Sequence, residues 1–288
     1  MRVAIIGANG QLGADLLASC ATRGVPAVGL THADIELADA TSVEAALDRA
    51  RATVVINTAA MHNVEACERE PDRAFAVNAL GVRHLALAAA RRDAALVHLS
   101  TDYVFDGAQR QPYVETDVPR PLNAYGVSKL AGEQFVTTLA PKHFVVRSSG
   151  LYGAHPSRAK AGGLNFVRLM LKLAREKGRV RVVTDEVVTP TYTVDLAEQI
   201  LDLAATDAYG TYHATNAGAC SWNAFAREIF RRAAPETIVD DACAADFPRP
   251  VARPLYSVLD NAGLRTLGID RMPDWCDALR RYLSTFDG

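Results

Sequence analysis

The sequence predicts an α/β protein, built as a doubly wound parallel sheet followed by a smaller C-terminal substrate lobe. Three observations predict this fold: short apolar runs alternate with amphipathic stretches, the apolar runs lack polar alternation, and the rhythm changes after Gly150. Strands that are apolar at every position are typical of parallel sheets, which helices cover on both faces. The chain has 288 residues, enough to bury a core without a disulfide or a structural metal.

Strands and helices are expected to alternate through the first 150 residues. The first strand is expected over residues 3–6, and it leads into a helix over 12–20. Right-handed crossovers between successive strands give the doubly wound sheet. The other expected strands cover 27–30, 54–56, 96–99 and 143–147, and the other helices cover 41–50, 73–90 and 127–139.

Beyond Gly150 the pattern becomes irregular. We expect a loop over 157–163, a periodic helix over 165–177, a strand over 180–183 and a helix over 194–204. Prolines in the tail predict short helices between loops; they are Pro235, Pro248, Pro250, Pro254 and Pro273. The first lobe is therefore expected over 1–150, rejoined by about 180–215, and the second over 151–179 and 216–288.

The charge balance bears on the partners of the protein. Lys and Arg total 31 against 33 Asp and Glu, which gives a formal net charge of -2. Without a basic excess the long-range attraction to nucleic acid is missing, so we expect no nucleic-acid partner. No run of about 18 uncharged apolar residues occurs, so we expect no membrane span.

The cysteines and the N-terminal residues predict a cytoplasmic protein. The first apolar run is too short for the core of a signal peptide. The cysteines are odd in number and never spaced C-x-x-C, which is typical of reduced thiols and excludes the usual zinc and disulfide patterns. They are Cys20, Cys67, Cys220, Cys243 and Cys276.

A glycine-rich loop follows the first strand, with Gly7, Gly10 and Gly13 spaced G-x-x-G-x-x-G. Gly7 permits a tight turn, Gly10 lets backbone N–H groups approach a pyrophosphate, and Gly13 allows the helix to pack closely on the strand. The N-terminus of the following helix adds partial positive charge. The order strand, loop, helix therefore predicts a Rossmann lobe that binds a dinucleotide, although the spacing differs from G-x-G-x-x-G.

The choice between NADH and NADPH stays open at the second strand. This strand ends with Leu30-Thr31-His32 and has no acidic residue at its tip. An acidic residue there would bind the ribose 2′-hydroxyl and repel a 2′-phosphate. His32 or Arg23 can contact such a phosphate, or His32 can simply lie in a solvated loop.

Side chains with hydroxyl, phenol and ammonium groups come after the fourth strand, where the site is expected. Ser100 and Thr101 come directly after the fourth strand, where ligand crevices open in such sheets. Tyr125 and Lys129 are four residues apart and share one face of a helix. We expect the Lys129 ammonium to lower the pKa of Tyr125. Tyr125 is then expected to exchange a proton with an alcohol or ketone while nicotinamide moves a hydride and Thr101 holds the carbonyl oxygen.

Longer stretches of the chain are similar to one known family. They include GANGQLG (7–13), LSTDYVFDG (99–107), YVETDVPRPLNAYGVSKLAGE (113–133), VVRSSGLYG (145–153) and TPTYTVDLAE (189–198). Through them nearly the whole chain resembles the dTDP-4-dehydrorhamnose reductase family of the extended short-chain dehydrogenase/reductase superfamily. The resemblance implies a Rossmann lobe with a C-terminal sugar-nucleotide lobe. It also implies NAD(P)H-dependent reduction of the 4-keto group of a dTDP-6-deoxy-sugar, the last step to dTDP-L-rhamnose.

The resemblance implies roles for individual residues. Tyr125 is the implied proton donor, Lys129 its electrostatic partner and a ligand of the nicotinamide ribose, and Thr101 the group that orients the carbonyl. Thr101 and Asp102 are implied to contact substrate. Arg253 either binds the substrate diphosphate or forms a structural salt bridge. The expected cofactor-binding residues are Gly7, Gly10, Gln11, Leu12, Glu36, Leu37, Ala59, Ala60, Met61, Tyr125 and Lys129.

Several positions depart from the family pattern or carry a second interpretation. Gly150 stands where many members have a Trp that contacts the sugar, which leaves the sugar specificity open. Asp15 matches an acidic position through which some members bind Mg²⁺ between subunits, but a single helical carboxylate is more often at the surface, and we expect no metal. Trp222 is expected to pack in the core or between the lobes rather than to stack on a base. Asn78 can bond backbone near the active site or brace a helix, and we favour the brace.

The expected partner is a small nucleotide-sugar, and a homodimer is a further expectation. Two alternative functions stay open. One is a sugar-nucleotide epimerase or dehydratase on the same scaffold, which would retain and regenerate its NAD. The other is a non-enzymatic NADP-binding regulatory subunit, like the partner of methionine adenosyltransferase that resembles this family.

Overall fold

The computed structural model describes residues 1–156 and 163–286. Within these ranges six strands form one sheet in the order β2-β1-β3-β4-β5-β10, and each neighbouring pair is parallel. The predicted fold class is confirmed. The strands are β1 (Val3–Ile6), β2 (Ala27–Leu30), β3 (Val54–Asn57), β4 (Ala95–Thr101), β5 (His143–Ser148) and β10 (Gly210–His213). The expected loop over 157–163 lies outside the described residues except for its last position.

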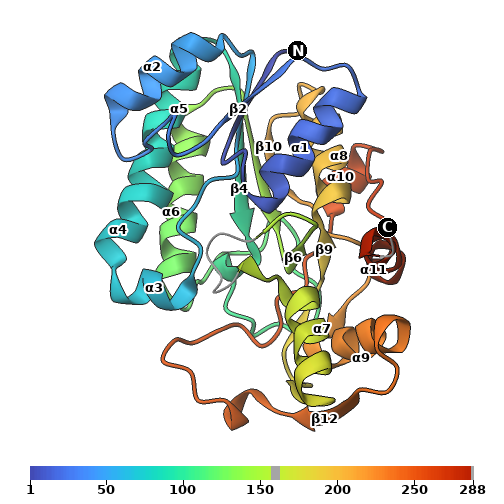
Figure 1. Cartoon of the computed structure of the whole chain (residues 1–288). Coiled ribbons are helices and arrows are strands. Elements are labelled where there is room, and N and C mark those ends of the chain that lie inside the picture. Colours follow the sequence, from blue (N-terminus) through green and yellow to red (C-terminus); the bar gives the residue numbers. More distant parts are fainter. Residues whose placement is uncertain (157–162, 287–288) are drawn as a thin grey trace.

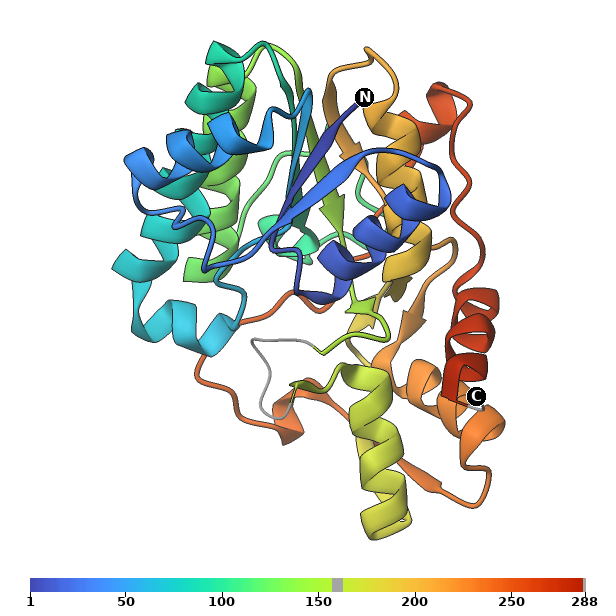
Figure 2. The same cartoon turned by 45° about the horizontal axis from the view of Figure 1, so that its top comes forward.

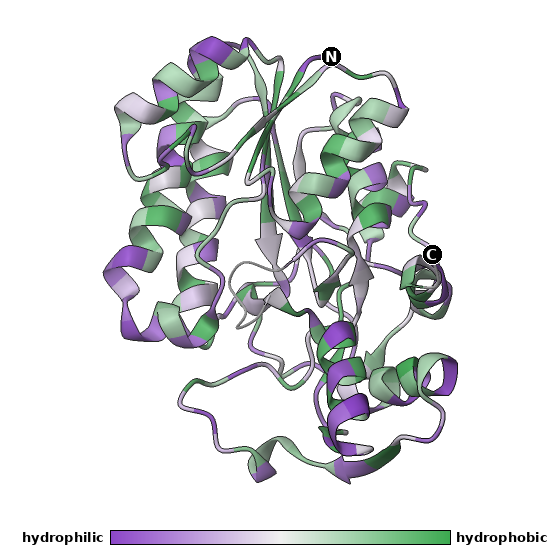
Figure 3. Ribbon diagram, in the orientation of Figure 1, coloured by the Kyte–Doolittle hydropathy of each residue, from purple (hydrophilic) through white to green (hydrophobic). Residues whose placement is uncertain are grey.

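Helices cover both faces of this sheet (Figure 1). One face packs on α1 (Gln11–Thr22) and α8 (Thr193–Ala204), and the other on α2 (Ala40–Ala50), α5 (Gly81–Arg91) and α6 (Ala124–Leu139). Successive strand residues point to opposite faces, so Val3 and Ile5 enter one apolar cluster while Ala4 and Ile6 enter the other. Figure 3 shows the resulting apolar strands between helices whose outer sides are polar.

The chain between β3 and β4 is helical but not one regular helix. It consists of α3 (Val64–Arg69), α4 (Pro71–Phe75), a π-helical turn (Ala76–Leu80) and α5. The expected single helix over 73–90 therefore contains a wider turn, which includes Asn78. Such turns occur mostly as single insertions, often at functional sites.

A second group of elements lies below the carboxyl ends of the strands (Figures 1 and 2). Here α7 (Phe166–Lys177), α9 (Trp222–Ala233) and α11 (Trp275–Leu283) enclose a separate apolar cluster that includes Tyr152 and Phe225. Trp222 packs on Phe166 with ring centroids 4.5 Å apart, as expected of a packing residue. The shorter elements are β6 (Leu151–Tyr152), β8 (Val187–Val188), β9 (Thr191–Tyr192), β11 (Cys220–Ser221) and α10 (Ala262–Thr266).

The return of the chain to the large sheet differs in detail from the expectation. The strand expected over 180–183 is β7 (Arg179–Val183), which pairs with β12 (Ile238–Ala242) outside the large sheet. Helix α8 and strand β10 do join the large sheet and its core. The division into two lobes stays a proposal; the separate apolar clusters support it, and the β7–β12 pairing favours assigning 179–183 to the substrate lobe.

No helix within the described ranges combines the length and the apolar character that crossing a membrane requires.

Candidate active site

The glycine loop lies between β1 and α1, where the strand order reverses and where ligands bind in open α/β sheets. A Cβ atom at Gly13 would lie 2.2 Å from the Gly7 carbonyl oxygen, so the first turn of α1 packs directly on the loop backbone. Gly10 is the N-cap and brings no side chain to the helix terminus. The N–H groups of the first turn thus remain available to an anion, and the loop fits the pyrophosphate of a dinucleotide.

Gln11 and Leu12 contribute only backbone groups to this loop, because their side chains have other contacts. The Gln11 side-chain oxygen accepts a hydrogen bond from Asn165 Nδ2 at 3.2 Å, so it connects the loop to the N-cap of α7. Leu12 is buried in the core of the α1 face. Both residues can therefore serve a pyrophosphate only through their N–H groups.

The residues after β2 form the edge where an adenosine ribose is expected. Leu37 is buried, whereas the Glu36 side chain is exposed and lies 3.5 Å from His32. Arg23 is held elsewhere by ion pairs to Glu198 and Asp202 of α8. The structure therefore does not favour Arg23 as a phosphate ligand.

The segment after β3 runs beside the glycine loop and contains Ala59, Ala60 and Met61, all partly exposed. Asn78 binds both backbone groups of Met61: its Oδ1 accepts from Met61 N at 2.9 Å, and its Nδ2 donates to Met61 O at 2.8 Å. Asn78 Nδ2 also donates to Ser128 Oγ at 3.0 Å. Asn78 thus bonds backbone near the expected site, which is the alternative to bracing a helix, and its amide also joins this segment to α6.

The structure brings Thr101 and Tyr125 together at the end of β4. Asn123 caps α6 by accepting from Gly126 N at 2.9 Å, which places Tyr125 in the first turn of the helix. The Thr101 side chain lies close enough to the phenol of Tyr125 to lower its pKa. Tyr103 packs edge-on against Tyr125, with ring centroids 5.7 Å apart. A hydroxyl and a phenol thus face the position expected for a carbonyl oxygen.

The pKa of Tyr125 shifts in the opposite direction to the expectation. Burial raises the pKa of this phenol well above its ordinary value, and the Asp102 carboxylate raises it further, while the Thr101 side chain lowers it in part. Burial outweighs any effect of Lys129, whose Nζ donates to Leu99 O at 2.7 Å and lies 3.2 Å from His98 Nε2. Tyr125 is therefore protonated at neutral pH.

Lys129 is the buried cation of the site, with 2% of its surface exposed. Burial lowers its pKa to about 8, although Glu133 one turn along α6 favours the charged form. Lys129 therefore changes its charge close to neutral pH. Sequence spacing predicted its place on the helix but not this environment.

Asp102 is a buried carboxylate at the centre of a hydroxyl network. It accepts hydrogen bonds from Ser149 Oγ at 2.9 Å and Thr101 Oγ1 at 3.1 Å, and the side chain of Ser257 lies close enough to lower its pKa. Burial raises the pKa of Asp102 above its ordinary value, and these hydroxyls offset part of the effect. The sequence reasoning missed Ser149 and Ser257, which no local pattern distinguishes from ordinary loop serines.

A buried ion pair lies behind this network and was also missed. Arg147 at the end of β5 donates to both carboxylate oxygens of Glu133, at 2.7 and 3.2 Å to Oε2 and 3.0 Å to Oε1. Ser100 Oγ donates to the same carboxylate at 2.5 Å. The pair fixes α6 on β4 and β5, and with it the helix that presents Tyr125 and Lys129.

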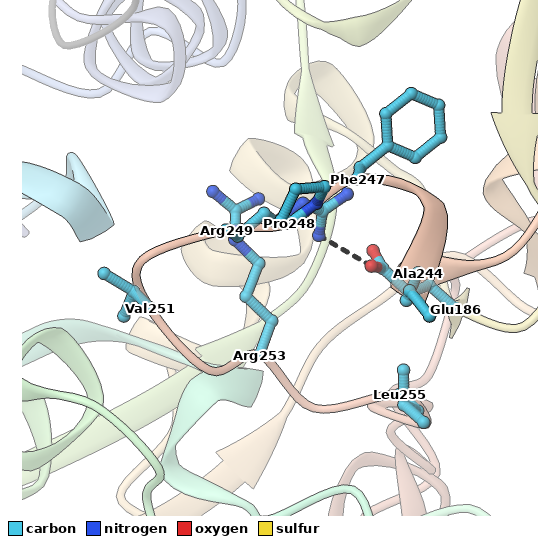
Figure 4. Close-up of a pocket in the computed structure, with 9 residues that line it drawn as sticks. Glu186, Ala244, Phe247, Pro248, Arg249, Val251, Arg253 and Leu255 are labelled. Carbon is cyan, nitrogen blue, oxygen red and sulfur yellow. Dashed lines mark hydrogen bonds and ion pairs between the residues drawn. The ribbon is translucent and has the colours of Figure 1, made fainter.

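A cavity of about 270 Å³ opens on the substrate-lobe side of the site (Figure 4). Arg249 and Arg253 both line it, and Arg249 Nη1 donates to Glu186 at 2.6 Å. Arg253 is ion-paired with Glu65, but its buried Nε has no hydrogen-bond partner within residues 1–156 and 163–286. The positive charge of Arg253 also acts on Tyr103, which packs on Tyr125. One residue that lines the cavity, Arg253, thus lies near Tyr103.

Asp15 and Gly150 mark two departures from the family pattern. Asp15 is buried rather than at the surface, and it accepts a hydrogen bond from Thr193 Oγ1 at 2.5 Å. The described part of the chain contains no group of three His, Cys, Asp or Glu side chains arranged for a metal. Gly150 has φ +58, and a Cβ there would lie 3.1 Å from Pro190 Cα, so this backbone leaves no room for a large side chain.

Comparison with known proteins agrees with this geometry. The family model described as RmlD substrate binding domain matches residues 1–287. The dTDP-4-keto-6-deoxy-D-glucose reductase of Streptomyces niveus is 40% identical over 281 residues, covering 96% of this chain and 94% of that protein. The crystal structure of a dTDP-4-dehydrorhamnose reductase from Clostridium acetobutylicum is 39% identical, with a TM-score of 0.95 and full coverage of both chains.

A second solved structure contains a dinucleotide. The dTDP-4-dehydrorhamnose reductase of Bacillus anthracis, in complex with NADP, is 38% identical, with a TM-score of 0.93 over 99% of each chain. The match extends over the glycine loop, the Thr101–Tyr125–Lys129 segment and the substrate lobe alike. The chain therefore belongs to the dTDP-4-dehydrorhamnose reductase family, within the extended short-chain dehydrogenase/reductase superfamily.

Proposed function

We propose that this protein is an NAD(P)H-dependent reductase of the 4-keto group of a dTDP-linked 6-deoxy-sugar, which converts dTDP-4-dehydrorhamnose to dTDP-L-rhamnose. The observation that carries the proposal is the contact between Thr101 and Tyr125 at the carboxyl end of β4, with Lys129 buried one turn along α6. The names of the three similar proteins reported above are those of reductases of dTDP-sugars, and they support the substrate class.

The dinucleotide supplies the hydride, and the protein supplies the proton. When substrate binds, the Thr101 hydroxyl turns its single hydrogen from Asp102 to the carbonyl oxygen and holds this oxygen next to the Tyr125 hydroxyl. As negative charge develops on that oxygen, Tyr125 transfers its phenolic proton to it, and the Lys129 ammonium stabilises the phenolate that remains. The raised pKa of Tyr125 suits a reductase, because the phenol is protonated before each turnover.

The cofactor is NADPH or NADH, bound at the Gly7–Gly13 loop. The absence of an acidic residue at the end of β2 leaves space for a 2′-phosphate. The complex of the Bacillus anthracis reductase with NADP supports NADPH. Glu36 is exposed and stands beside this edge, so we assign it to the adenosine end together with Leu37.

We assign the substrate diphosphate to the cavity that Arg249 and Arg253 line. A guanidinium group binds a phosphate with two parallel hydrogen bonds, and the unpartnered Nε of Arg253 is a donor of this kind. Glu65 and Glu186 hold the two arginines in place. This assignment makes Arg253 a ligand of the substrate. Its ion pair with Glu65 then exists before substrate binds, and the diphosphate replaces Glu65 as the partner of Arg253.

The replacement of Tyr125 by Phe tests the proposal. Tyr125→Phe removes the proton donor and keeps the ring, so we expect the oxidation of NADPH by dTDP-4-dehydrorhamnose to slow by about 10²–10⁴-fold. Calorimetric titration with NADPH should give an unchanged affinity. Tyr209→Phe, directly before β10 and packed on Phe144 of β5, is the matched control. Undiminished turnover in Tyr125→Phe would remove Tyr125 from the mechanism.

The same absorbance assay separates the alternative functions. A reductase oxidises one NADPH for each sugar reduced, whereas an epimerase or dehydratase regenerates its cofactor and a regulatory subunit gives no turnover. Offering dTDP-, UDP- and GDP-linked 4-keto sugars, including dTDP-4-keto-6-deoxy-D-glucose, identifies the preferred substrate. This panel matters here because Gly150 replaces the Trp implied at the sugar.

Two further expectations are kept as proposals. A cytoplasmic location is supported by the cysteines, all five of which are free thiols. A homodimer is supported by the resemblance alone, and sedimentation velocity at several protein concentrations measures it directly.

A further inference from the structure

His98 is a fully buried imidazole in β4 that the proposed reaction does not use. Both of its ring nitrogens have polar neighbours. Asn57 Nδ2 lies 3.2 Å from Nδ1, and Lys129 Nζ lies 3.2 Å from Nε2. Since Lys129 is part of the proposed catalytic set, the proton position on His98 bears on the chemistry of the site.

The neighbours of Asn57 determine the direction of the first hydrogen bond. Asn57 Oδ1 accepts from Ala59 N at 3.1 Å. A backbone N–H can only donate, so the amide oxygen faces Ala59 and the amide nitrogen faces His98. The amide nitrogen also only donates, so Nδ1 of His98 must accept. A neutral imidazole with Nδ1 as acceptor has its proton on Nε2.

The second hydrogen bond then determines which form of Lys129 fits. The Nε2–H group of His98 points at Lys129 Nζ. An ammonium has three donors and no acceptor, so two donors would face each other. The uncharged amine has a lone pair for Nε2–H and still donates to Leu99 O at 2.7 Å. All four groups have complementary partners only when Lys129 is uncharged and His98 is neutral.

We propose that His98, held as its Nε2–H tautomer by Asn57, is a positioning residue that donates a hydrogen bond to Lys129 Nζ and favours the uncharged amine. Burial acts in the same direction, since it lowers the pKa of both Lys129 and His98. The described ionisable groups on the neighbouring elements affect the charge of Lys129 in another way, or they act on Tyr125 instead. Glu133 on α6 favours the ammonium, and Arg147 on β5 neutralises part of that effect through its ion pair. Asp102, Tyr103 and Cys67 act on Tyr125 at the substrate side.

The consequence for catalysis rests on the proposed reductase activity. If the Lys129 ammonium stabilises the Tyr125 phenolate, kcat/KM falls on the alkaline side as Lys129 loses its proton. His98 and Asn57 together bring that fall close to neutral pH. Changing the tautomer of His98 should therefore move the alkaline limb without removing any group that touches the substrate.

Asn57→Asp tests the proposal by reversing the network. One carboxylate oxygen still accepts from Ala59 N, and the other accepts from His98, so the ring proton moves to Nδ1 and Nε2 accepts from the Lys129 ammonium. In ¹⁵N NMR spectra we expect the His98 proton on Nε2 in the natural sequence and on Nδ1 in Asn57→Asp. The alkaline limb of kcat/KM should move up by about one pH unit or more.

Two further variants complete the test. Asn223→Asp also places a carboxylate at a buried asparagine, on α9, and it should leave both the His98 tautomer and the alkaline limb unchanged. His98→Gln keeps a polar group at the Nε2 position; its amide oxygen can accept from the ammonium, so the limb should again move up. This variant keeps the proposal testable if Asn57→Asp does not fold.

The outcomes are distinct from those of the proposed function. A proton on Nδ1 of His98 in the natural sequence, or an alkaline limb that stays in place in Asn57→Asp and His98→Gln, would overturn the proposal. If no 4-keto sugar oxidises NADPH, the proposed function fails, but the NMR tautomer and an NMR titration of Lys129 still decide the role of His98.

Discussion

At the scale of single residues, two features shape the site. One is the burial of titratable side chains, and the other is the presence of glycine where backbone atoms leave little space for a Cβ. Burial keeps Tyr125 protonated, as the proton-donor role proposed for it requires, and burial lowers the pKa of Lys129 to about 8. Gly13 and Gly150 matter because backbone atoms occupy the space of a Cβ. At Gly150 the left-handed backbone alone disfavours a residue with a side chain.

Replacing Gly13 by Ala tests the packing of the cofactor loop. The added methyl would lie 2.2 Å from the Gly7 carbonyl oxygen, so the first turn of α1 must move away from the loop. We expect NADPH affinity to fall by about tenfold or more, because the N–H groups no longer converge on the pyrophosphate. Gly24→Ala is the control, since a Cβ at Gly24 meets no atom within 4 Å and only its φ of +65 is strained. Equal losses of affinity in the two variants would contradict the explanation.

At the scale of elements, the site is held by the fit of α6 on β4 and β5. The Arg147–Glu133 pair is almost fully buried, with side chains 6% and 3% exposed. Arg147 also lies over the ring of Phe105, 5.3 Å from its centroid. Such a pair contributes little net stability compared with apolar residues, but losing one partner leaves a buried charge uncompensated.

Glu133→Gln should therefore destabilise the protein by about 3–5 kcal/mol. The amide keeps the size of the side chain and removes the negative charge that Arg147 needs. Urea unfolding followed by circular dichroism measures the change. Glu176→Gln on α7 removes an exposed partner of Lys172, and it should cost no more than about 0.5 kcal/mol. A loss below 1 kcal/mol in Glu133→Gln would argue against a buried, unsolvated pair.

At the scale of the whole molecule, buried neutral histidines link stability to pH. His213 Nδ1 lies 3.0 Å from Tyr113 O, and its Nε2 faces Arg147 at 3.5 Å. Burial, together with the charge of Arg147, lowers the pKa of His213 from 6.5 to about 3. The pKa of His98 is lowered as well. As the pH decreases, the unfolded chain binds a proton at each of these rings, whereas the folded chain keeps them neutral.

The free energy of unfolding should consequently fall as the pH decreases from 6.5 towards 3. The slope for each such histidine is at most about 1.4 kcal/mol per pH unit. Burial raises the pKa values of Asp15 and Asp102, so these carboxyls increase the free energy of unfolding as the pH decreases. The effect of His213 is therefore measured by comparing the natural protein with a His213 variant. His213→Asn keeps a donor for Tyr113 and does not titrate, so its slope should be shallower. Parallel slopes for both proteins would show that His213 is not the neutral ring described.

The sequence by itself determined the features that depend on nearby residues. The alternation of apolar strands and helices predicted the sheet, the glycine spacing predicted the dinucleotide loop, and the four-residue spacing placed Tyr125 and Lys129 on one helix face. Strand β10 was not expected, because Gly210–His213 has no apolar run of its own. It forms because the backbone N–H and C=O groups along β5 pair with those of Gly210–His213.

Only the tertiary structure decided the charge states and partners within the site. Asp102 meets Ser149 across 47 residues, and Arg253 meets Glu65 across 188. Lys129 Nζ contacts His98 and Leu99, and burial outweighs any effect of Lys129 on the pKa of Tyr125. The physical reason is that burial and hydrogen-bond direction set a pKa, and both depend on atoms that the fold brings together from distant parts of the chain.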